Sequence, residues 1–179
     1  LPFALIGGLA VSARTEPRFT RDVDFAIAVA SDQDAEMIVH SFLKAGFLSE
    51  SVLENPIRGR LATMRLRRNP RAPIVDLLFL SSGIEAEIAQ EATPLAVLGQ
   101  RVPVARIGHL IAMKLVARDD RNRPADQADL RALSKAASED EWECARVAVD
   151  LIHERGFDRG RDLRSALADW RRQARDPSP

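Results

Sequence analysis

The chain has 179 residues and a mass of 19.8 kDa, which suffices for one compact domain with a buried core. Apolar residues make up 46% and charged residues 29%, a balance that excludes a disordered chain, and no apolar run approaches the roughly 20 residues that span a bilayer. The 26 basic and 26 acidic residues cancel, so net charge alone gives no reason to expect a polyanionic partner.

The chain opens with an apolar segment that runs into two glycines. Residues 2–6 predict a short buried strand, Gly7 and Gly8 a turn, and residues 9–14 a helix. Glycines in such a turn let backbone N–H groups approach phosphates, which the positive end of the following helix attracts. Taken alone, the pair is more typical of an ordinary strand-to-helix turn. Ser12 is a candidate hydroxyl donor to a bound nucleotide.

An Asp-x-Asp pair opens the second expected strand, residues 22–29. Asp22 and Asp24 should lie on the same face, because strand side chains alternate between the two faces. Paired carboxylates are typical ligands of Mg²⁺. In the loop before them, Arg18 could reach a phosphate and Thr20 could anchor the turn of a nucleotide site, although a solvated loop has the same composition.

Residues 31–45 predict a helix, and two strands that form a hairpin follow it. Residues 61–67 alternate as a half-buried strand does, and residues 73–80 are apolar except for Asp76. In a mixed sheet, this hairpin would lie beside the strand that begins at Asp22 and would bring the three acids together. A carboxylate among Ile, Val, Leu and Phe is costly to bury unless a cation or a donor meets it.

Three convergent carboxylates predict a catalytic metal site with two Mg²⁺ ions. Asp22 and Asp24 would bind the ion that accompanies the phosphates of an NTP, and Asp76 would complete the site of a second ion. The second ion would activate an acceptor hydroxyl, whose proton Asp76 could accept. This arrangement is typical of nucleotidyl transfer, in which the protein mainly positions the triphosphate and neutralises its charge.

The second half of the chain predicts helices over residues 107–118, 126–137, 139–155 and 161–175. We therefore expect an α/β (α+β) fold, with a mixed β-sheet flanked by helices and a C-terminal helical lobe. The sheet lobe, residues 1–105, would carry the catalytic groups, and residues 106–179 would form the helical lobe of a single compact domain.

Three further features could serve a nucleotide site, and each also has an ordinary structural explanation. Lys114 borders the buried face of its helix, where it could contact a phosphate or pair with an active-site carboxylate, or simply cover the core with its stem. Asp126 is a candidate nucleotide ligand, but it also resembles a helix-capping acid. The densest basic run could meet phosphates, although a solvated strand face is the more usual explanation; it comprises Arg58, Arg60, Arg65, Arg67, Arg68 and Arg71.

The single cysteine, Cys144, cannot form an internal disulfide, and no basic n-region or cleavage site precedes the first apolar run. We therefore expect a protein of the reducing cytoplasm that makes no membrane contact. The histidines are isolated from one another and from the cysteine, so we assign no zinc to His40, His109 or His153.

The stretch from Leu5 to Gly8, followed by Arg18-Phe-Thr-Arg-Asp22-Val-Asp24, resembles the polymerase-β nucleotidyltransferase superfamily. Within it, the chain most resembles the AbiEii-type toxin family of type IV toxin–antitoxin systems. Members of that family also carry a lysine on a helix, then an arginine and Asp-x-x-Asp-Leu, which resemble Lys114, Arg123 and residues 126–130 here. The resemblance covers roughly residues 1–133.

The resemblance implies transfer of an NMP from an NTP to an acceptor hydroxyl, which on a tRNA 3′ end or a protein would serve a toxin, and a cognate antitoxin partner. Relatives usually carry a helical segment before the first strand, so a sequence that starts at Leu1 is expected to be a fragment. Modification of a small molecule such as an antibiotic is an alternative. A nucleotide-binding regulatory module without turnover is another, although the presence of all three acids argues against it.

Overall fold

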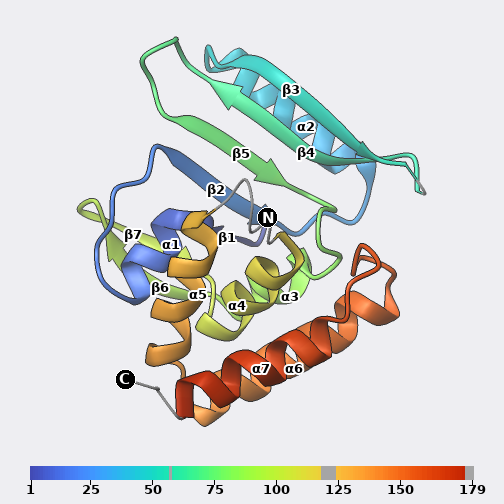
Figure 1. Ribbon diagram of the computed structural model, residues 1–179. Coiled ribbons are helices and arrows are strands. Elements are labelled where there is room, and N and C mark those ends of the chain that lie inside the picture. The colour runs from blue at the N-terminus through green and yellow to red at the C-terminus, as the bar shows by residue number, and fades with distance from the viewer. Residues whose placement is uncertain (57, 118–123, 176–179) are drawn as a thin grey trace.

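The computed structural model of the chain describes residues 1–56, 58–117 and 124–175. Within these residues, strands β1 to β7 form one mixed sheet in the order β3-β4-β5-β2-β1-β7-β6 (Figure 1). The strands are β1 Phe3–Ile6, β2 Asp22–Ile27, β3 Leu48–Asn55, β4 Arg60–Arg67, β5 Ile74–Leu78, β6 Thr93–Val97 and β7 Gln100–Val104. The helices are α1 Gly7–Arg14, α2 Asp32–Lys44, α3 Glu85–Gln90, α4 Ile107–Ala117, α5 Pro124–Ala136, α6 Glu139–Glu154 and α7 Leu163–Arg175. The expected mixed α/β fold is therefore confirmed.

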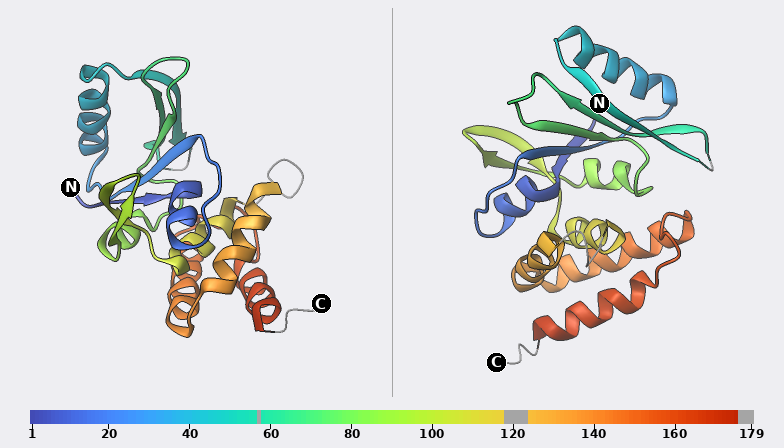
Figure 2. Two further views of the ribbon diagram at one scale, coloured as in Figure 1. Left: turned by 90° about the vertical axis from the view of Figure 1, so that its left-hand side faces the viewer. Right: turned by 45° about the horizontal axis from the view of Figure 1, so that its top comes forward.

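The helices gather in two places on either side of the central strands. Helix α2 packs against β4 at one end of the sheet, whereas α4 to α7 lie together at the opposite end of the molecule (Figures 1 and 2). The larger core joins β1 and α1 to α4 through α7, and a smaller core fills the space between α2, β4 and β5. In the described part of the chain, no helix is both long and apolar enough to cross a membrane.

The register of the central strands aligns four positions in one row. Strand β1 is antiparallel to β2 and pairs Ile6 with Asp24, and β2 is parallel to β5 and pairs Asp24 with Asp76. Strand β4 is antiparallel to β5 and pairs Arg65 with Asp76. Side chains of directly paired residues project from the same face, so Asp24, Asp76 and Arg65 are neighbours across three strands.

The alternation predicted for the hairpin is present, and its two faces have different neighbours. Ala62, Met64 and Leu66 are buried, and the last two belong to the small core that includes Ala35 of α2. The opposite face carries Arg65, in the row with the aspartates. The predicted helices of the second half are also present with ends shifted by a few residues; the predicted end at 118 lies outside the described residues.

Four elements were not predicted, and each lacks the usual signal. Strand β3 is exposed along almost its whole length, so it shows no apolar alternation. Strands β6 and β7 each contain a proline, Pro94 and Pro103, which is unusual inside a sheet. Helix α3 spans only 6 residues, which is too short for a helical period to be recognised.

Candidate active site

One cleft collects every site residue expected from the sequence except Ser12. It has a volume of about 440 Å³ and lies where β2, β4 and β5 face the first residues of α1 and the helices α4 and α5. We call it the aspartate cleft. The expected residues that line it are Gly7, Gly8, Arg18, Thr20, Asp22, Asp24, Asp76, Lys114 and Asp126.

Asp76 already has a cation beside it in this structure. Arg65 donates from Nε to Oδ1 at 2.8 Å and from Nη2 to Oδ2 at 2.7 Å, a two-bond pairing that fixes the orientation of the carboxylate. The hydrogen bonds to Asp76 raise the pKa of Arg65 above its ordinary value. Asp76 is only 6% exposed, so this pairing offsets much of the cost of burying its charge. Arg65 therefore belongs to the cleft rather than to a solvated strand face.

Asp24 is the carboxyl group with the least compensation. Burial, together with the negative charges of Asp76 and Asp22, raises its pKa from 3.8 to about 6. Lys114 and Arg65 act in the opposite direction but do not outweigh burial and the two neighbouring acids. A cation bound between these oxygens would remove the repulsion, and oxygen donors are what Mg²⁺ prefers. The donor set therefore fits the expected metal.

The three carboxylates are nevertheless spread along the cleft. Among the described residues, they are not a group in which three ligand oxygens all lie within 4.8 Å of one another. Asp22 and Asp24 are two residues apart on one strand, and Asp76 is turned toward Arg65. Two ions that share Asp24 would use this spread better than one ion held by all three, as in two-metal sites with ions about 4 Å apart.

Gly7 provides space for Asp24. Its φ of +64° is a conformation that glycine adopts readily, and a Cβ at this position would lie 1.9 Å from Oδ2 of Asp24. At Gly8, a Cβ would lie 2.7 Å from Nη2 of Arg18 and 3.0 Å from Oγ1 of Thr20. Gly7 is therefore required by its backbone conformation and by the close approach of Asp24, whereas at Gly8 the end of the Arg18 side chain could shift to admit a Cβ.

The start of α1 also borders the cleft, and among the described residues no side chain caps it. The N-cap residue, Ile6, makes no side-chain capping bond, and the first turn of α1 contains no acidic residue. The first N–H groups of an α-helix have no partner within the helix, so they are available to phosphate oxygens. This geometry matches the arrangement expected of Gly7 and Gly8, whose roles toward a nucleotide remain predictions.

Lys114 is held by two acids of the next helix. Its Nζ lies 2.6 Å from Oδ1 of Asp126 and 2.7 Å from Oδ2 of Asp129, and all three side chains are largely buried. Arg18, in the loop before β2, also pairs with Asp129: its Nε lies 2.6 Å from Oδ1 and its Nη2 lies 2.7 Å from Oδ2. The pairing explains Asp126 better than capping does. Arg123, quoted for the resemblance, lies outside the described residues.

Ser12 has a different position from the one expected. Its hydroxyl accepts from the backbone N–H of Arg18 at 3.2 Å and donates to the carbonyl of Arg18 at 3.3 Å. It is not among the described residues that line the cleft. Ser12 therefore shapes the loop that carries Arg18 and Thr20, and a direct contact with a nucleotide is not what this geometry offers.

A second, wider depression of about 830 Å³ adjoins the aspartate cleft and shares Arg18, Thr20 and Asp22 with it. Arginines line this depression from the loop before β2, from β4 and from the turn after it. Phe19 is 79% exposed there, and the guanidinium of Arg21 lies 5.7 Å from the centre of its ring. We call it the arginine groove, and define it by Arg18, Phe19, Arg21, Arg67 and Arg71.

A family model described as "Nucleotidyl transferase AbiEii toxin, Type IV TA system" matches residues 1–177. No match is found among curated proteins. Solved structures with a similar arrangement include an antigenic nucleotidyltransferase-like protein from Paracoccidioides brasiliensis, 20% identical, with a TM-score of 0.45 over 93% of this chain and 84% of that one. A putative nucleotidyltransferase from H. pylori is 18% identical, with a TM-score of 0.46 over 97% and 85%. The lincosamide adenylyltransferase LnuA is 12% identical, with a TM-score of 0.47 over 75% and 87%.

Proposed function

We propose, from the premise that the chain belongs to the AbiEii family of nucleotidyltransferases, that it transfers an NMP from an NTP to an acceptor hydroxyl with the help of Mg²⁺. The observation that carries this proposal is the row of Asp24, Asp76 and Arg65 across three strands, beside the start of α1, which no side chain caps among the described residues. Carboxylates and phosphate-binding donors then meet in one cleft. Membership in the family makes the chain a nucleotidyltransferase; the metal, the residue roles and the acceptor are the proposal.

Asp22 and Asp24 would hold the Mg²⁺ that accompanies the NTP, and Asp24 and Asp76 would hold a second ion. Bound there, Mg²⁺ would neutralise charge that develops on the phosphates and on the attacking oxygen. Asp76 would accept the proton of the acceptor hydroxyl, and Arg65 would keep this carboxyl oriented. A bond forms between the acceptor oxygen and the α-phosphorus, the bond from that phosphorus to the bridging oxygen breaks, and pyrophosphate leaves.

The triphosphate would lie against the start of α1 and the cationic side chains of the opposite wall. Gly7 and Gly8 place no Cβ there, so the backbone donors stay accessible. Lys114 and Arg18 would exchange part of their pairing with Asp126 and Asp129 for contact with phosphate oxygens. Their present partners hold them at the cleft before the nucleotide arrives, which lowers the entropic cost of ordering two long side chains.

For the acceptor, the arginine groove favours a nucleic-acid end such as the 3′ end of a tRNA. Arg21 and Arg71 line this groove beside Arg18 and Arg67, which pair with Asp129 and Glu50, and together they offer the positive charge that attracts a phosphate backbone. Phe19 presents an exposed ring on which an unpaired base can stack. The groove begins where the aspartate cleft ends, so a strand bound in it would reach Asp76 with its terminal hydroxyl. As in other type IV systems, a cognate antitoxin would counteract the activity.

Transfer of label from α-labelled NTP tests the proposal. Purified protein with Mg²⁺ is incubated with bulk tRNA, with a total protein extract, or with a panel of aminoglycoside and lincosamide antibiotics. We expect label in tRNA, none from γ-labelled NTP, and none with Asp24→Ala. The matched control is Asp169→Ala, which removes a half-buried aspartate of α7, outside the cleft lining, that pairs only with Arg172 within the described residues.

The outcomes separate the candidates. Label in protein or in an antibiotic would keep the chemistry but refute the nucleic-acid acceptor. Absence of label from every acceptor, or equal transfer by Asp24→Ala, would refute catalysis and leave a nucleotide-binding module as the better explanation.

A further inference from the structure

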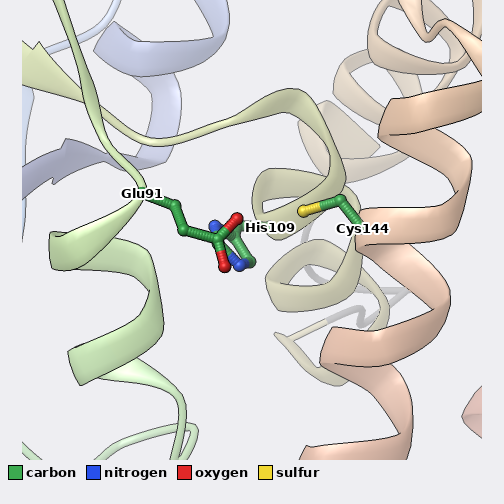
Figure 3. A group of neighbouring side chains, drawn as sticks. All are labelled: Glu91, His109 and Cys144. Carbon is green, nitrogen blue, oxygen red and sulfur yellow. The ribbon is translucent and has the colours of Figure 1, made fainter.

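A second cluster of ionisable side chains lies away from the aspartate cleft, between α3, α4 and α6. Glu91 follows α3, His109 lies in the first turn of α4, and Cys144 lies in α6 (Figure 3). One candidate ligand atom of each residue lies within 4.8 Å of the other two, and no other group in the described part of the chain does so. The expectation that the histidines are isolated from the cysteine is therefore wrong for His109. We call these three residues the cysteine cluster.

The imidazole of His109 has unmet bonding capacity. Its side chain is only 3% exposed, and Nδ1 is buried with no hydrogen-bond partner among the described residues. Leaving such an atom unpaired costs about 1–3 kcal/mol, so buried histidines usually find a donor, an acceptor or a metal. Burial lowers the pKa of His109, which keeps the ring neutral at pH 7 and therefore in the form that binds metals.

Cys144, in contrast to His109, is not in its metal-binding form until a cation is bound. Burial raises the pKa of its thiol to about 12, so at neutral pH the sulfur keeps its proton. A thiolate at this place needs a positive partner in direct contact, and a bound metal ion deprotonates a coordinating thiol outright. The backbone N–H of His109 also faces the sulfur and would stabilise the thiolate once it forms.

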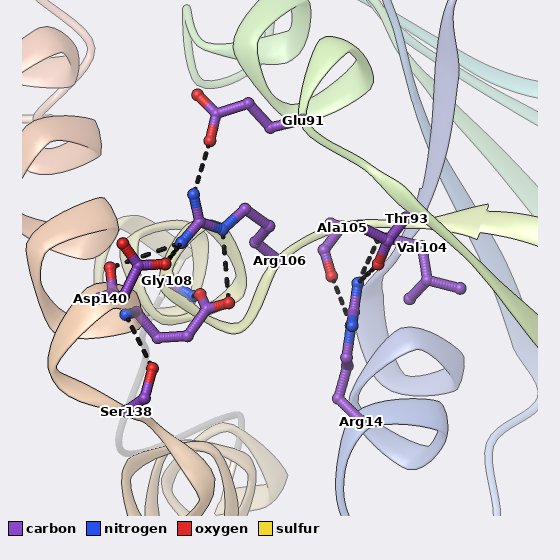
Figure 4. Close-up of polar contacts among 10 residues, drawn as sticks. Arg14, Glu91, Thr93, Val104, Ala105, Arg106, Gly108, Ser138 and Asp140 are labelled. Atoms are coloured by element: carbon purple, nitrogen blue, oxygen red, sulfur yellow. Dashed lines mark hydrogen bonds and ion pairs between the residues drawn. The ribbon is translucent and has the colours of Figure 1, made fainter.

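Glu91 can change partners without leaving a cation unpaired. Arg106 donates from Nη1 to Oε2 of Glu91 at 3.0 Å, but it also pairs with Asp140 and, from Nε at 3.3 Å, with Glu141 (Figure 4). Glu141 is fixed in turn by the backbone N–H of Gly108, at 2.6 Å. Release of Glu91 would therefore leave Arg106 with two acids. A cavity of about 220 Å³, lined by all three members of the cysteine cluster, gives an ion access.

We propose that Glu91, His109 and Cys144 bind a divalent transition metal ion, with Zn²⁺ as the natural occupant. Thiolate, imidazole and carboxylate together suit Zn²⁺ and exclude Mg²⁺, which takes oxygen ligands. Binding releases the thiol proton to solvent and exchanges the contact of Glu91 with Arg106 for one with the metal. Tetrahedral coordination needs ligand atoms roughly 3.5 Å apart, and these atoms lie within 4.8 Å of one another, so the cluster would close by at most about 1 Å, with water in the fourth position.

The ion would act as a clasp rather than as part of the transfer chemistry. It would join the end of α3, beside the sheet, to α4 and α6 of the helical lobe. Helix α4 also carries Lys114 at the aspartate cleft, so the clasp would stabilise the helix that forms the cationic wall of that cleft. The site uses none of the residues proposed for catalysis and stands whether or not the proposed function does.

Co²⁺ is the probe for this site, because a thiolate bound to Co²⁺ gives a charge-transfer absorption band in the near ultraviolet. We expect the reduced full chain to show this band at about one ion per chain. Zn²⁺ should abolish it, whereas excess Mg²⁺ should leave it intact, and Asp24→Asn should retain it. Cys144→Ser should lose the band while circular dichroism reports an intact fold.

Glu91→Gln keeps the experiment decisive even if changes at the buried residues impair folding, because Glu91 is exposed. It should weaken Co²⁺ binding at least about tenfold. The matched control is Glu143→Gln, which removes an acid that lines the same cavity but pairs with Arg146 outside the cluster. Absence of the band from the reduced chain, its survival in Cys144→Ser, or equal effects of the two glutamate variants would overturn the proposal.

Discussion

The aspartate cleft and the cysteine cluster solve the same electrostatic problem with different atoms. In each, burial makes the ionised form of a ligand unfavourable: the pKa of Asp24 rises to about 6 and that of Cys144 to about 12. In each, an arginine holds one acid, Arg65 in the cleft and Arg106 in the cluster. The difference lies in the donors, which are oxygens in the cleft but sulfur, nitrogen and oxygen in the cluster.

This difference explains why the sequence could predict one site and not the other. Two carboxylates that are two residues apart on a strand can be predicted to share a face, because strand side chains alternate. A histidine and a cysteine on separate helices form no sequence pattern that predicts their contact. It also implies that the two sites should respond to different ions and different substitutions. Experiments can therefore separate the two sites and can test, at each, the electrostatic feature that they share.

The largest effect is expected from removal of the carboxylate at the centre of the cleft. Asp24→Ala should lower the rate of nucleotidyl transfer by at least about 10³-fold. Without this carboxylate, Mg²⁺ would no longer neutralise the charge that develops on the phosphates, and the activation free energy would rise by several kcal/mol. The same variant should bind Co²⁺ at the cysteine cluster unchanged. Single-turnover transfer and Co²⁺ absorption, measured on one preparation, check both statements; a parallel loss would mean that the two sites are not independent.

The next largest effect concerns the buried ion pairs beside the cleft. Lys114→Met should reduce the free energy of unfolding by about 3–5 kcal/mol, because it leaves Asp126 buried without its cation and leaves Asp129 with Arg18 alone among the described residues. Urea unfolding measures this loss. Lys135→Met, at an exposed position of the same region, is the matched control.

A double variant distinguishes lost charge from lost packing. Lys114→Met combined with Asp126→Asn should recover part of the stability, since the second change removes the buried charge that the first leaves without its cation. If the double variant is as unstable as the sum of the single variants, the pairing does not govern this wall of the cleft.

The raised pKa of Asp24 predicts a pH-dependent stability without metal. The folded chain holds this proton more tightly than the unfolded chain, so stability is fully present below pH 3.8 and falls as the pH rises through about 6. Asp24→Asn carries no such cost and should be more stable than the native chain by up to about 3 kcal/mol at pH 7.5. Near pH 4 the difference should vanish.

Thermal melts of both chains across this range, in a chelating buffer, provide the measurement. Addition of Mg²⁺ with NTP should raise the melting temperature of the native chain at pH 7.5 but not that of Asp24→Asn. A difference between the two chains that is constant from pH 4 to pH 7.5 would show that Asp24 does not carry the unfavourable charge.

The sequence predicted those parts of the molecule whose signal is local. The strands with Asp22, Asp24 and Asp76 follow from apolar runs and period-two alternation, Lys114 follows from its place on a helix face, and the resemblance supported Asp126. The role of Arg65 was missed, because its strand face has the alternation of a solvated surface. Only the register between β4 and β5, which the connecting turn and the apolar pattern determine, shows that this face holds Asp76.

The cysteine cluster lay beyond any sequence signal. His109 and Cys144 are 35 residues apart on two helices, without the short spacings typical of zinc ligands. Only the packing of α4 against α6 brings them together. Gly108 allows that approach, because a Cβ there would lie 2.4 Å from the carbonyl oxygen of Glu141. A close helix contact of this kind depends on tertiary structure, which periodicity does not report.

A smaller effect should follow from a methyl group at Gly7. Gly7→Ala meets two costs, the positive φ and the contact with Asp24, whereas Gly46→Ala meets only the first because nothing lies within 4 Å of its Cβ. Both variants should lose about 1–2 kcal/mol of stability from the backbone conformation. Only Gly7→Ala should also weaken Mg²⁺-dependent transfer, and equal activity of the two variants would contradict the proposed contact.

The smallest effect is expected at the arginine groove, where single phosphate contacts are weak. Arg71→Ala should lower tRNA affinity only a few-fold and reduce the salt dependence of binding by about one ion, since one phosphate contact is lost. Arg68→Ala removes the same charge from the same loop, but its guanidinium lies over Phe47, outside the groove. Fluorescence anisotropy of labelled tRNA over a salt series separates the two. Equal salt slopes for both variants would mean that net charge, rather than the groove, attracts the acceptor.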